Sequence, residues 1–251
     1  MHGTRIRRGN RAPLPQGAPI NKSVRPSHAV FTSTQLASLD LSSGSDPFAY
    51  FERIWCINLK SADDRWRQMA ARFERLGVGD RVERFAAVST PGNHHVGCAL
   101  SHRRVMAAAR EAGVERILVF EDDAVFLDEA RAVLAAAVAE LRDIAWDIFY
   151  LGACVRAPEC PPIPGCGHLL MPRRQTCTHA VAYNAEFMDR VLAELPADLH
   201  EMLQWIDEHT AIDQYFARLV DHQPVIITPS VASQPWLLPY EDPAIQHKFT
   251  L

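Results

Sequence analysis

Residues 117–123 read Ile-Leu-Val-Phe-Glu-Asp-Asp, so four apolar residues run directly into three acids. The apolar run has the length and the β-branched content of a buried strand. In an open α/β sheet, ligands bind at the carboxyl ends of the strands. Three adjacent acids at such an end would repel one another. A divalent cation such as Mn²⁺ or Mg²⁺ relieves that repulsion and prefers oxygen ligands. A solvated turn after a core strand is the plainer alternative, and this run alone leaves both open.

Length and composition favour one folded domain with tails. The chain has 251 residues, of which 48% are hydrophobic and 22% charged, and its net charge of -4 gives no general attraction to nucleic acid. The composition of residues 1–46 predicts a disordered or loosely packed N-terminal tail. We expect residues 47–235 to form the folded domain and residues 236–251 to form a C-terminal tail. No apolar run has the length of a transmembrane segment or follows the N-terminal arginines as in a secretory signal, so we expect a cytoplasmic protein that could still contact a membrane surface.

Strand patterns alternate with helical patterns along the folded part. Expected strands are 54–59, 84–88, 117–120, 147–151, 180–183 and 225–228, and expected helices are 61–76, 99–112, 126–141, 186–195 and 210–220. Ser61 and Asp64 form a candidate capping box, and Gly77 is a fitting end for the first helix. Alternation of this kind predicts an α/β fold with a mostly parallel central sheet and helices on both faces.

Seven short motifs follow one another along the folded part of the chain. Ile-Asn-Leu at 57–59 is followed by Gly-Cys-Ala-Leu-Ser-His at 97–102, Glu-Asp-Asp at 121–123 and Tyr-Leu-Gly at 150–152. His-Ala-Val-Ala-Tyr at 179–183, Asp-Gln-Tyr-Phe at 213–216 and Pro-Ser-Val-Ala-Ser-Gln at 229–234 complete the order. In this order the motifs resemble glycosyltransferase family 25, which includes bacterial lipopolysaccharide and lipooligosaccharide galactosyltransferases and collagen galactosyltransferases.

The resemblance implies a GT-A-type nucleotide-sugar-binding fold, with residues 47–235 as the catalytic domain. It implies an inverting hexosyltransferase that uses a UDP-sugar donor, usually UDP-galactose, with Mn²⁺ or Mg²⁺ and a glycan or lipid-linked glycan acceptor. If the strand stayed extended through the acids, Glu121 and Asp123 would face one side and Asp122 the other. We therefore expect Asp123, with Glu121, to hold the metal, and Glu121 or Asp122 to contact the donor.

Four further residues are expected at the donor through the resemblance: Asn58, Arg65, Ser101 and His102. Each also has an ordinary structural alternative, namely a turn former, a surface cation, a helix-start serine and a partly buried histidine. Gly97 would let the backbone approach the donor, or would simply form a turn. Both interpretations stay open at this point.

An inverting transfer needs a group that accepts the proton of the acceptor hydroxyl, and a carboxylate is the usual choice. Asp213 matches the family's Asp and is the first candidate for the catalytic base, with Asp207 and Glu208 as the others. Asp213 also lies three residues after Thr210, so it could instead belong to a capping box.

Two other functions remain open. A binding-only relative would fit Ser89, which stands where relatives often carry an Asp. A sugar nucleotidyltransferase fits less well, because it commonly has a Gly-rich loop after the first strand and residues 59–62 contain no Gly. No Cys-x-x-Cys pair occurs among four further cysteines, Cys154, Cys160, Cys166 and Cys177, so we expect unpaired thiols in preference to structural zinc. These cysteines lie in or beside a mobile loop expected over 153–174, which is a candidate lid.

Overall fold

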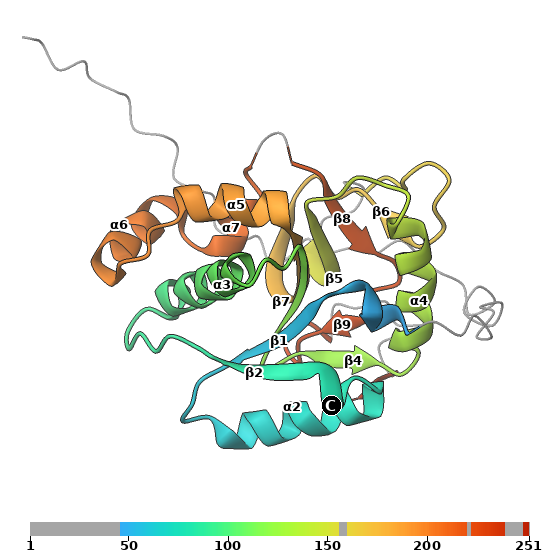
Figure 1. Cartoon of the computed structure of the whole chain (residues 1–251), viewed down its shortest axis with the longest axis horizontal. Helices are drawn as coiled ribbons and strands as arrows, with labels where there is room; N and C mark the ends of the chain where they lie inside the picture. The colour runs from blue at the N-terminus through green and yellow to red at the C-terminus, as the bar shows by residue number, and fades with distance from the viewer. Residues whose placement is uncertain (1–45, 156–159, 220–221, 239–247, 251) are drawn as a thin grey trace, which may run out of the picture.

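The computed structural model describes residues 46–155, 160–219, 222–238 and 248–250. The predicted tail of residues 1–46 therefore lies outside the described residues except for Asp46. The central sheet has seven strands in the order β2-β1-β3-β7-β5-β8-β6 (Figure 1). Their bounds are β1 Arg53–Asn58, β2 Val82–Ala86, β3 Arg116–Glu121, β5 Ile148–Val155, β6 Leu169–Leu170, β7 Gln175–Asn184 and β8 Pro224–Ile227.

Five of the seven strands run in the same direction. β1 pairs in parallel with β2 and β3, and β5 pairs in parallel with β8. β7 is antiparallel to both β3 and β5, and β6 is antiparallel to β8. The sheet is therefore largely parallel with two reversed strands. The carboxyl ends of β1, β2 and β3 share one edge of the sheet.

Helices cover both faces of the sheet, and the strand side chains alternate between two cores. On β3, Leu118 and Phe120 join one core, whereas Ile117 and Val119 join the other. The first core packs under α2 (Asp63–Leu76), α4 (Ala130–Leu141) and the short helix η1 (Pro47–Tyr50). The second packs under α3 (His94–Glu111), α5 (Ala185–Glu194), α6 (Leu199–His209) and α7 (Ile212–Phe216), and Figure 1 shows these two groups on opposite sides. The predicted α/β class and layering are confirmed.

A second, three-stranded sheet lies beside the acids, in the order β10-β4-β9. β4 is Val125–Leu127, β9 is Ala232–Ser233 and β10 is Phe249–Thr250, and both neighbours run antiparallel to β4. The helix expected from residue 126 was therefore wrong in its first turn, because these residues extend and pair before α4 begins. The C-terminal segment, expected as a tail, contributes β10 to this sheet.

The helix starts were the least accurate predictions. α2 begins at Asp63 after Ala62, with no side-chain cap, so the capping box at Ser61 was wrong, although Gly77 ends the helix as expected with φ 71°. α3 begins at His94, five residues before the predicted start, because the Asn93 side chain accepts the His95 amide as an N-cap. α6 was missed, although Asp198 caps it by accepting the amides of His200 and Glu201.

Gly152 lets the second sheet approach the central one. A Cβ at this position would lie 1.8 Å from the carbonyl oxygen of Ala232 and 2.9 Å from Nε2 of His179. Neither backbone nor buried ring can move freely, so we expect Gly152→Ala to lower the free energy of unfolding by about 2 kcal/mol or more. Gly167→Ala is the matched control, because its Cβ would meet Glu140 at an ordinary 3.5 Å. Urea titrations giving equal stability for the two variants would contradict this packing.

Among the described residues, no helix combines the length and the apolar character that crossing a lipid bilayer requires.

Candidate functional site

The three acids lie at the shared carboxyl edge of β1, β2 and β3. Glu121 is the last residue of β3, and Asp122 and Asp123 form a turn that the Ala124 amide closes on the Glu121 carbonyl at 3.2 Å. The strand does not stay extended through the acids, so the alternation argument that placed Asp123 with Glu121 does not hold. Each carboxylate instead has its own set of partners.

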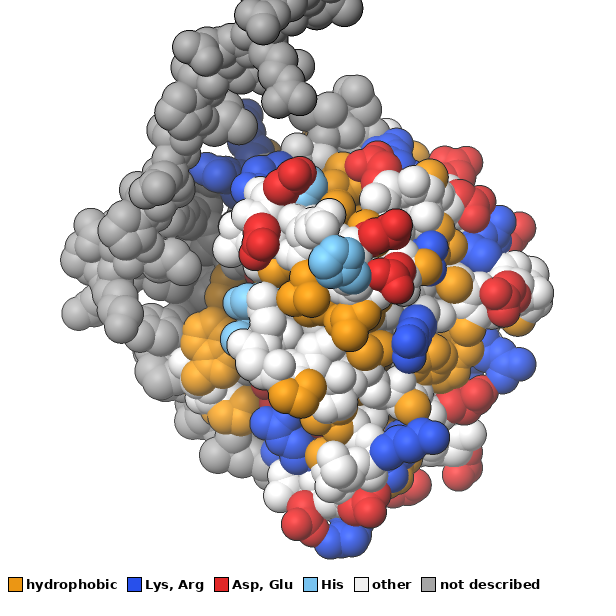
Figure 2. Space-filling view, turned by 90° about the vertical axis from the view of Figure 1, so that its left-hand side faces the viewer, with side chains coloured by type: hydrophobic (Ala, Val, Ile, Leu, Met, Phe, Trp, Pro, Cys, Tyr) orange, Lys and Arg blue, Asp and Glu red, His pale blue; other side chains and the backbone are white. Residues whose placement is uncertain are grey.

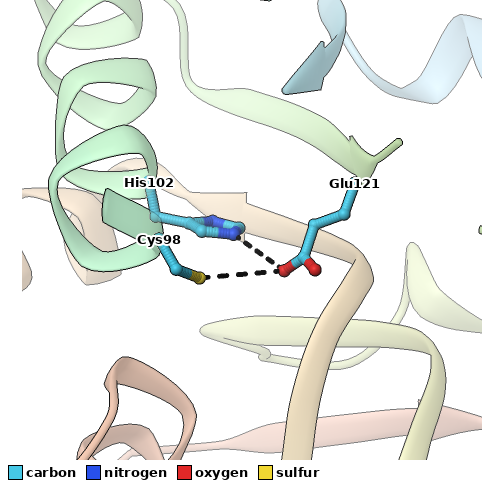
Figure 3. Close-up of side chains that lie close together, drawn as sticks. All are labelled: Cys98, His102 and Glu121. Atoms are coloured by element: carbon cyan, nitrogen blue, oxygen red, sulfur yellow. Dashed lines mark hydrogen bonds and ion pairs between the residues drawn. The ribbon is translucent and has the colours of Figure 1, made fainter. Parts of the chain in front are cut away.

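Glu121 is held from the side of the second core. Its Oε1 accepts a hydrogen bond from Thr178 Oγ1 at 2.7 Å and lies 3.3 Å from His102 Nε2 and 4.0 Å from Cys98 Sγ (Figure 3). The Tyr183 hydroxyl lies 3.0 Å from His102 Nδ1. With the His102 Nε2–H donating to Glu121, Tyr183 must donate to Nδ1, so the ring has a fixed tautomer and orientation.

Opposing influences act on the Glu121 carboxyl. Burial raises its pKa, but the hydrogen bonds from His102 and Thr178 and the nearby imidazoles outweigh burial, so the pKa is lowered from its ordinary value. Glu121 therefore stays ionised. The hydrogen bonds converge on Oε1, which fixes the direction of the carboxylate.

Asp122 is held from the opposite side of the sheet. Asn58 Nδ2 donates to its Oδ2 at 2.6 Å, and Arg65 on α2 forms an ion pair with its Oδ1 at 2.7 Å. Asn58 is 1% exposed, and its Oδ1 accepts a hydrogen bond from Arg84 at 2.8 Å. The structure therefore gives Asn58 a bridging role between Asp122 and Arg84. Its predicted contact with the donor remains a prediction.

Asp123 is hydrogen-bonded to the segment that follows β9. Gln234 Nε2 donates to both carboxylate oxygens, at 2.9 and 2.8 Å. Burial raises the pKa of Asp123, and repulsion from Glu121 and Asp122 raises it further. The hydrogen bond from Gln234 lowers this pKa but does not outweigh the other effects. Glu121 and Asp122 are thus close enough to destabilise the charged form of Asp123.

The donor set fits a hard divalent cation. The acids supply carboxylate oxygens, which Mn²⁺ and Mg²⁺ prefer, and the mutual repulsion felt by Asp123 is what such a cation would relieve. Among the residues that the structure describes, the grouping whose potential ligand atoms all lie within 4.8 Å of one another is Cys98, His102 and Glu121, which shares only Glu121 with the three acids. There, however, the His102 nitrogens face Glu121 and Tyr183, and burial raises the pKa of the Cys98 thiol well above its ordinary value. That grouping fits a role in orienting Glu121.

A basic pocket opens at the same edge of the sheet. It is lined by Lys60 just beyond the end of β1, by Arg84 within β2 and by Ala86 at the end of β2. Arg84 also donates to the carbonyl oxygens of Leu59 and Lys60, so the guanidinium is fixed in place. Two hydrogen bonds through Asn58 link Arg84 of the pocket to Asp122.

The motif at 97–102 lies inside α3, and no turn occurs there. Ser101 is buried, donates to the Gly97 carbonyl at 2.6 Å and accepts the Val88 amide at 2.9 Å. A Cβ on Gly97 would lie 2.6 Å from both the Val88 carbonyl and Thr90 Oγ1. These two residues therefore fix the segment after β2 against α3, and the alternative of a turn at Gly97 is wrong.

We expect Ser101→Ala to act on stability more than on ligand binding. It leaves the buried Val88 amide without its partner, which should cost about 1–3 kcal/mol in unfolding free energy. Ser101→Thr, which keeps the hydroxyl, is the control. A variant that lost donor affinity at unchanged melting temperature would instead favour direct contact with the donor.

Asp213 lies near the start of α7 and faces β7. Its Oδ2 accepts the Cys177 amide at 2.9 Å and its Oδ1 accepts the Gln214 amide at 2.8 Å. The N-cap of α7 is Ala211, and Thr210 has φ 73°, so the proposed capping box was wrong. Asp213 nevertheless lies close enough to Cys98 to raise the pKa of its thiol, as Glu121 and Asp123 also do. The structure thus brings Asp213 to the same neighbourhood as the acids.

Asp207 and Glu208 lie elsewhere, exposed on α6. The face of the molecule that includes the outer ends of α3 and α6 carries acidic, basic and hydrophobic side chains intermixed (Figure 2). Neither acid shows the ties to the sheet edge that Asp213 has. Their predicted alternative role as base remains untested.

Three contributors to the site were missed as site residues: Thr178 and Gln234, which hold Glu121 and Asp123, and Arg84 in the basic pocket. Gln234 closes the motif at 229–234, so its place in the motif order was an available signal. Two of the loop cysteines also differ from expectation. Cys154 and Cys177 lie in β5 and β7, so they are parts of the central sheet.

Comparison with known proteins supports the resemblance. Residues 92–187 match the family model described as glycosyltransferase family 25 (LPS biosynthesis protein). The chain is 29% identical over 132 residues to the mouse protein "Inactive glycosyltransferase 25 family member 3" and, over the same length, to the rat "Probable inactive glycosyltransferase 25 family member 3". These alignments cover 51% of this chain but only 21% and 22% of the relatives.

Solved structures give only distant likenesses. One is a glycosyltransferase involved in glycosylation of the major capsid of PBCV-1, with 12% identity, a TM-score of 0.40 and coverage of 69% of this chain and 79% of that one. Another is mannose-1-phosphate geranyltransferase from Thermus thermophilus, with 15% identity, a TM-score of 0.37 and coverage of 69% and 58%. Such scores are too low to assign a role. The family match over residues 92–187 spans α3, the three acids and β7, so this part of the chain, which carries the acids, is similar to glycosyltransferase family 25.

Proposed function

We propose that this protein is a metal-dependent inverting glycosyltransferase that moves a hexose from a UDP-sugar to a hydroxyl group of a glycan or lipid-linked glycan. The observation that carries the proposal is the arrangement at one edge of the sheet. A fixed set of acids, Glu121, Asp122 and Asp123, is linked to a basic pocket by two hydrogen bonds through Asn58. A nucleotide diphosphate bound with a cation needs both kinds of surface.

Each part of this edge has a distinct task in the proposal. Lys60 and Arg84 attract the diphosphate of the donor. Asn58 holds the side chains of Arg84 and Asp122 in fixed positions relative to each other. Asp123, with Glu121 or Asp122, would hold the cation. When bound, such a cation neutralises the charge that develops on the departing UDP. Thr178 and Gln234 fix the carboxylates before the donor arrives, so little reorganisation is needed.

Asp213 is the proposed base. In an inverting transfer the acceptor hydroxyl attacks the anomeric carbon as UDP leaves, and its proton must pass to a nearby group. The Cys177 and Gln214 amides fix the Asp213 carboxylate at the edge where the acids lie. Galactose as the sugar rests on the family resemblance.

The experiment that tests this proposal combines binding and turnover. Thermal unfolding is followed with UDP, with Mn²⁺, and with both, and hydrolysis of a panel of UDP-hexoses is then measured with Mn²⁺. We expect the largest rise in melting temperature with both ligands together, and slow release of UDP from at least one UDP-hexose. No stabilisation by the pair of ligands would contradict the donor site.

A binding-only function is the second candidate, and one observation favours it. The curated relatives that match are described as inactive or probably inactive. The two candidates differ in one measurement. Stabilisation by UDP and Mn²⁺ without release of UDP from any donor, even with acceptor glycans present, would favour binding alone.

A further inference from the structure

Two cysteines from different strands lie in contact next to the proposed base. Cys154 is on β5 and Cys177 is on β7, and their Sγ atoms are 3.2 Å apart, with the Cys177 thiol donating to Cys154. Neither is in a disulfide in this structure. Sulfur atoms this close need only a small approach to reach the bond length of about 2.05 Å in a disulfide.

An unusual backbone conformation brings the sulfurs together. Cys154 is paired with Thr176, so in a regular ladder the next residue, Cys177, would face the opposite side of the sheet. Cys177 instead has φ 72°, and the β5–β7 register shifts between Gly152 and Cys154. A positive φ is uncommon outside glycine and is seen repeatedly at functional sites.

We propose that Cys154 and Cys177 are a modification site that forms a reversible disulfide by exchange with a low-molecular-weight disulfide such as oxidised glutathione. Cys154 attacks first, because the Cys177 thiol donates its proton to Cys154, and this hydrogen bond, together with burial, raises the pKa of the Cys177 thiol. One glutathione leaves as its thiol and the other stays bound to Cys154. The Cys177 sulfur then attacks the Cys154 sulfur of this mixed disulfide and releases the second glutathione as its thiol. The two cysteines lose two electrons and two protons, and both appear in the two glutathione thiols.

The disulfide would act on the proposed active site through the backbone. The Cys177 amide donates to Asp213, and the next residue, Thr178, donates to Glu121. Drawing the sulfurs together by about 1 Å shifts Cys177 relative to α7, which weakens the hydrogen bond to Asp213. This consequence rests on the proposed function, whereas formation of the bond does not.

The test uses the whole chain, equilibrated with reduced and oxidised glutathione at several ratios, alkylated and digested with trypsin. Cleavage after arginine gives residues 143–156 and 175–190, each with a single cysteine. We expect these two peptides to appear joined, two hydrogens lighter than their sum, and to separate after dithiothreitol. Cys166→Ser should leave the joined peptide intact, whereas Cys154→Ser should remove it. Two fully alkylated peptides at every ratio would overturn the proposal.

The link to Asp213 has its own readout. We expect the Cys177 amide to exchange with solvent at least about tenfold faster in the oxidised protein, because its acceptor is displaced. Sugar transfer should fall with oxidation and return with dithiothreitol, and Cys154→Ser should be insensitive. Equal amide exchange in both forms would overturn the link. If the reduced protein transfers no sugar at all, the proposed function fails, while the joined peptide and the amide exchange still decide this inference.

Discussion

Asp123→Asn is expected to abolish Mn²⁺-dependent binding of UDP while the protein keeps its fold. The substitution removes a carboxylate from the acidic cluster, and a neutral amide is a much weaker ligand for a hard cation. Gln234 can still donate to the one oxygen that the new amide keeps, so the segment after β9 should stay in place. Isothermal titration of UDP in the presence of Mn²⁺ should show a loss of affinity on the order of 100-fold or more.

Asp80→Asn is the matched control for this variant. Asp80 is exposed in the short helix η2 (Gly79–Arg81), away from the acidic cluster, and its substitution makes the same change in charge. We expect its affinity for UDP with Mn²⁺ to equal that of the unmodified protein. Unchanged affinity in Asp123→Asn would show that Asp123 is not a metal ligand, and Glu121 and Asp122 would then be tested in the same way.

Asp213→Asn is expected to lower sugar transfer by on the order of 10²-fold or more at saturating donor and acceptor. The amide oxygen can still accept one of the two backbone amides that Asp213 holds, so most of the local structure should persist. Asparagine is, however, a far poorer base than a carboxylate. Donor affinity should therefore be nearly unchanged, which separates a loss of chemistry from a loss of binding.

Asp213→Ala separates the chemical role from the structural one. It removes the acceptor for both the Cys177 and Gln214 amides, and we expect it to lower the free energy of unfolding by about 1–3 kcal/mol. If Asp213→Asn transferred sugar at nearly the normal rate while Asp213→Ala was destabilised, Asp213 would be purely structural. Asp207 and Glu208 would then be the next candidates for the base.

The sequence was sufficient to predict six strands of the central sheet and the edge at which the acids lie, whereas β6 and the three strands of the second sheet were missed. A run of apolar residues buried on both sides, such as 117–120, has few alternatives to a central strand, and the acids that follow it must then lie at its carboxyl end. The alternation of Leu118 and Phe120 with Ile117 and Val119 between two cores follows from the period of a strand. Local rules therefore predicted this part of the fold.

The details of the site depend on contacts between residues distant in sequence, which local rules do not supply. Gln234 reaches Asp123 across 111 positions, and Thr178 reaches Glu121 across 57. The start of α3 was missed because a single side chain, Asn93, sets it. The meeting of Cys154 and Cys177 depends on a positive φ at a residue that rarely adopts one.

The most direct test of a metal-dependent donor site is a crystal structure of the protein grown with Mn²⁺ and UDP, with anomalous scattering used to locate the manganese. We expect the anomalous peak in direct contact with Asp123 and with oxygen atoms of the UDP diphosphate, and the uridine towards the pocket of Lys60, Arg84 and Ala86. A peak among Cys98, His102 and Glu121, or UDP bound with no manganese beside the acids, would contradict the account.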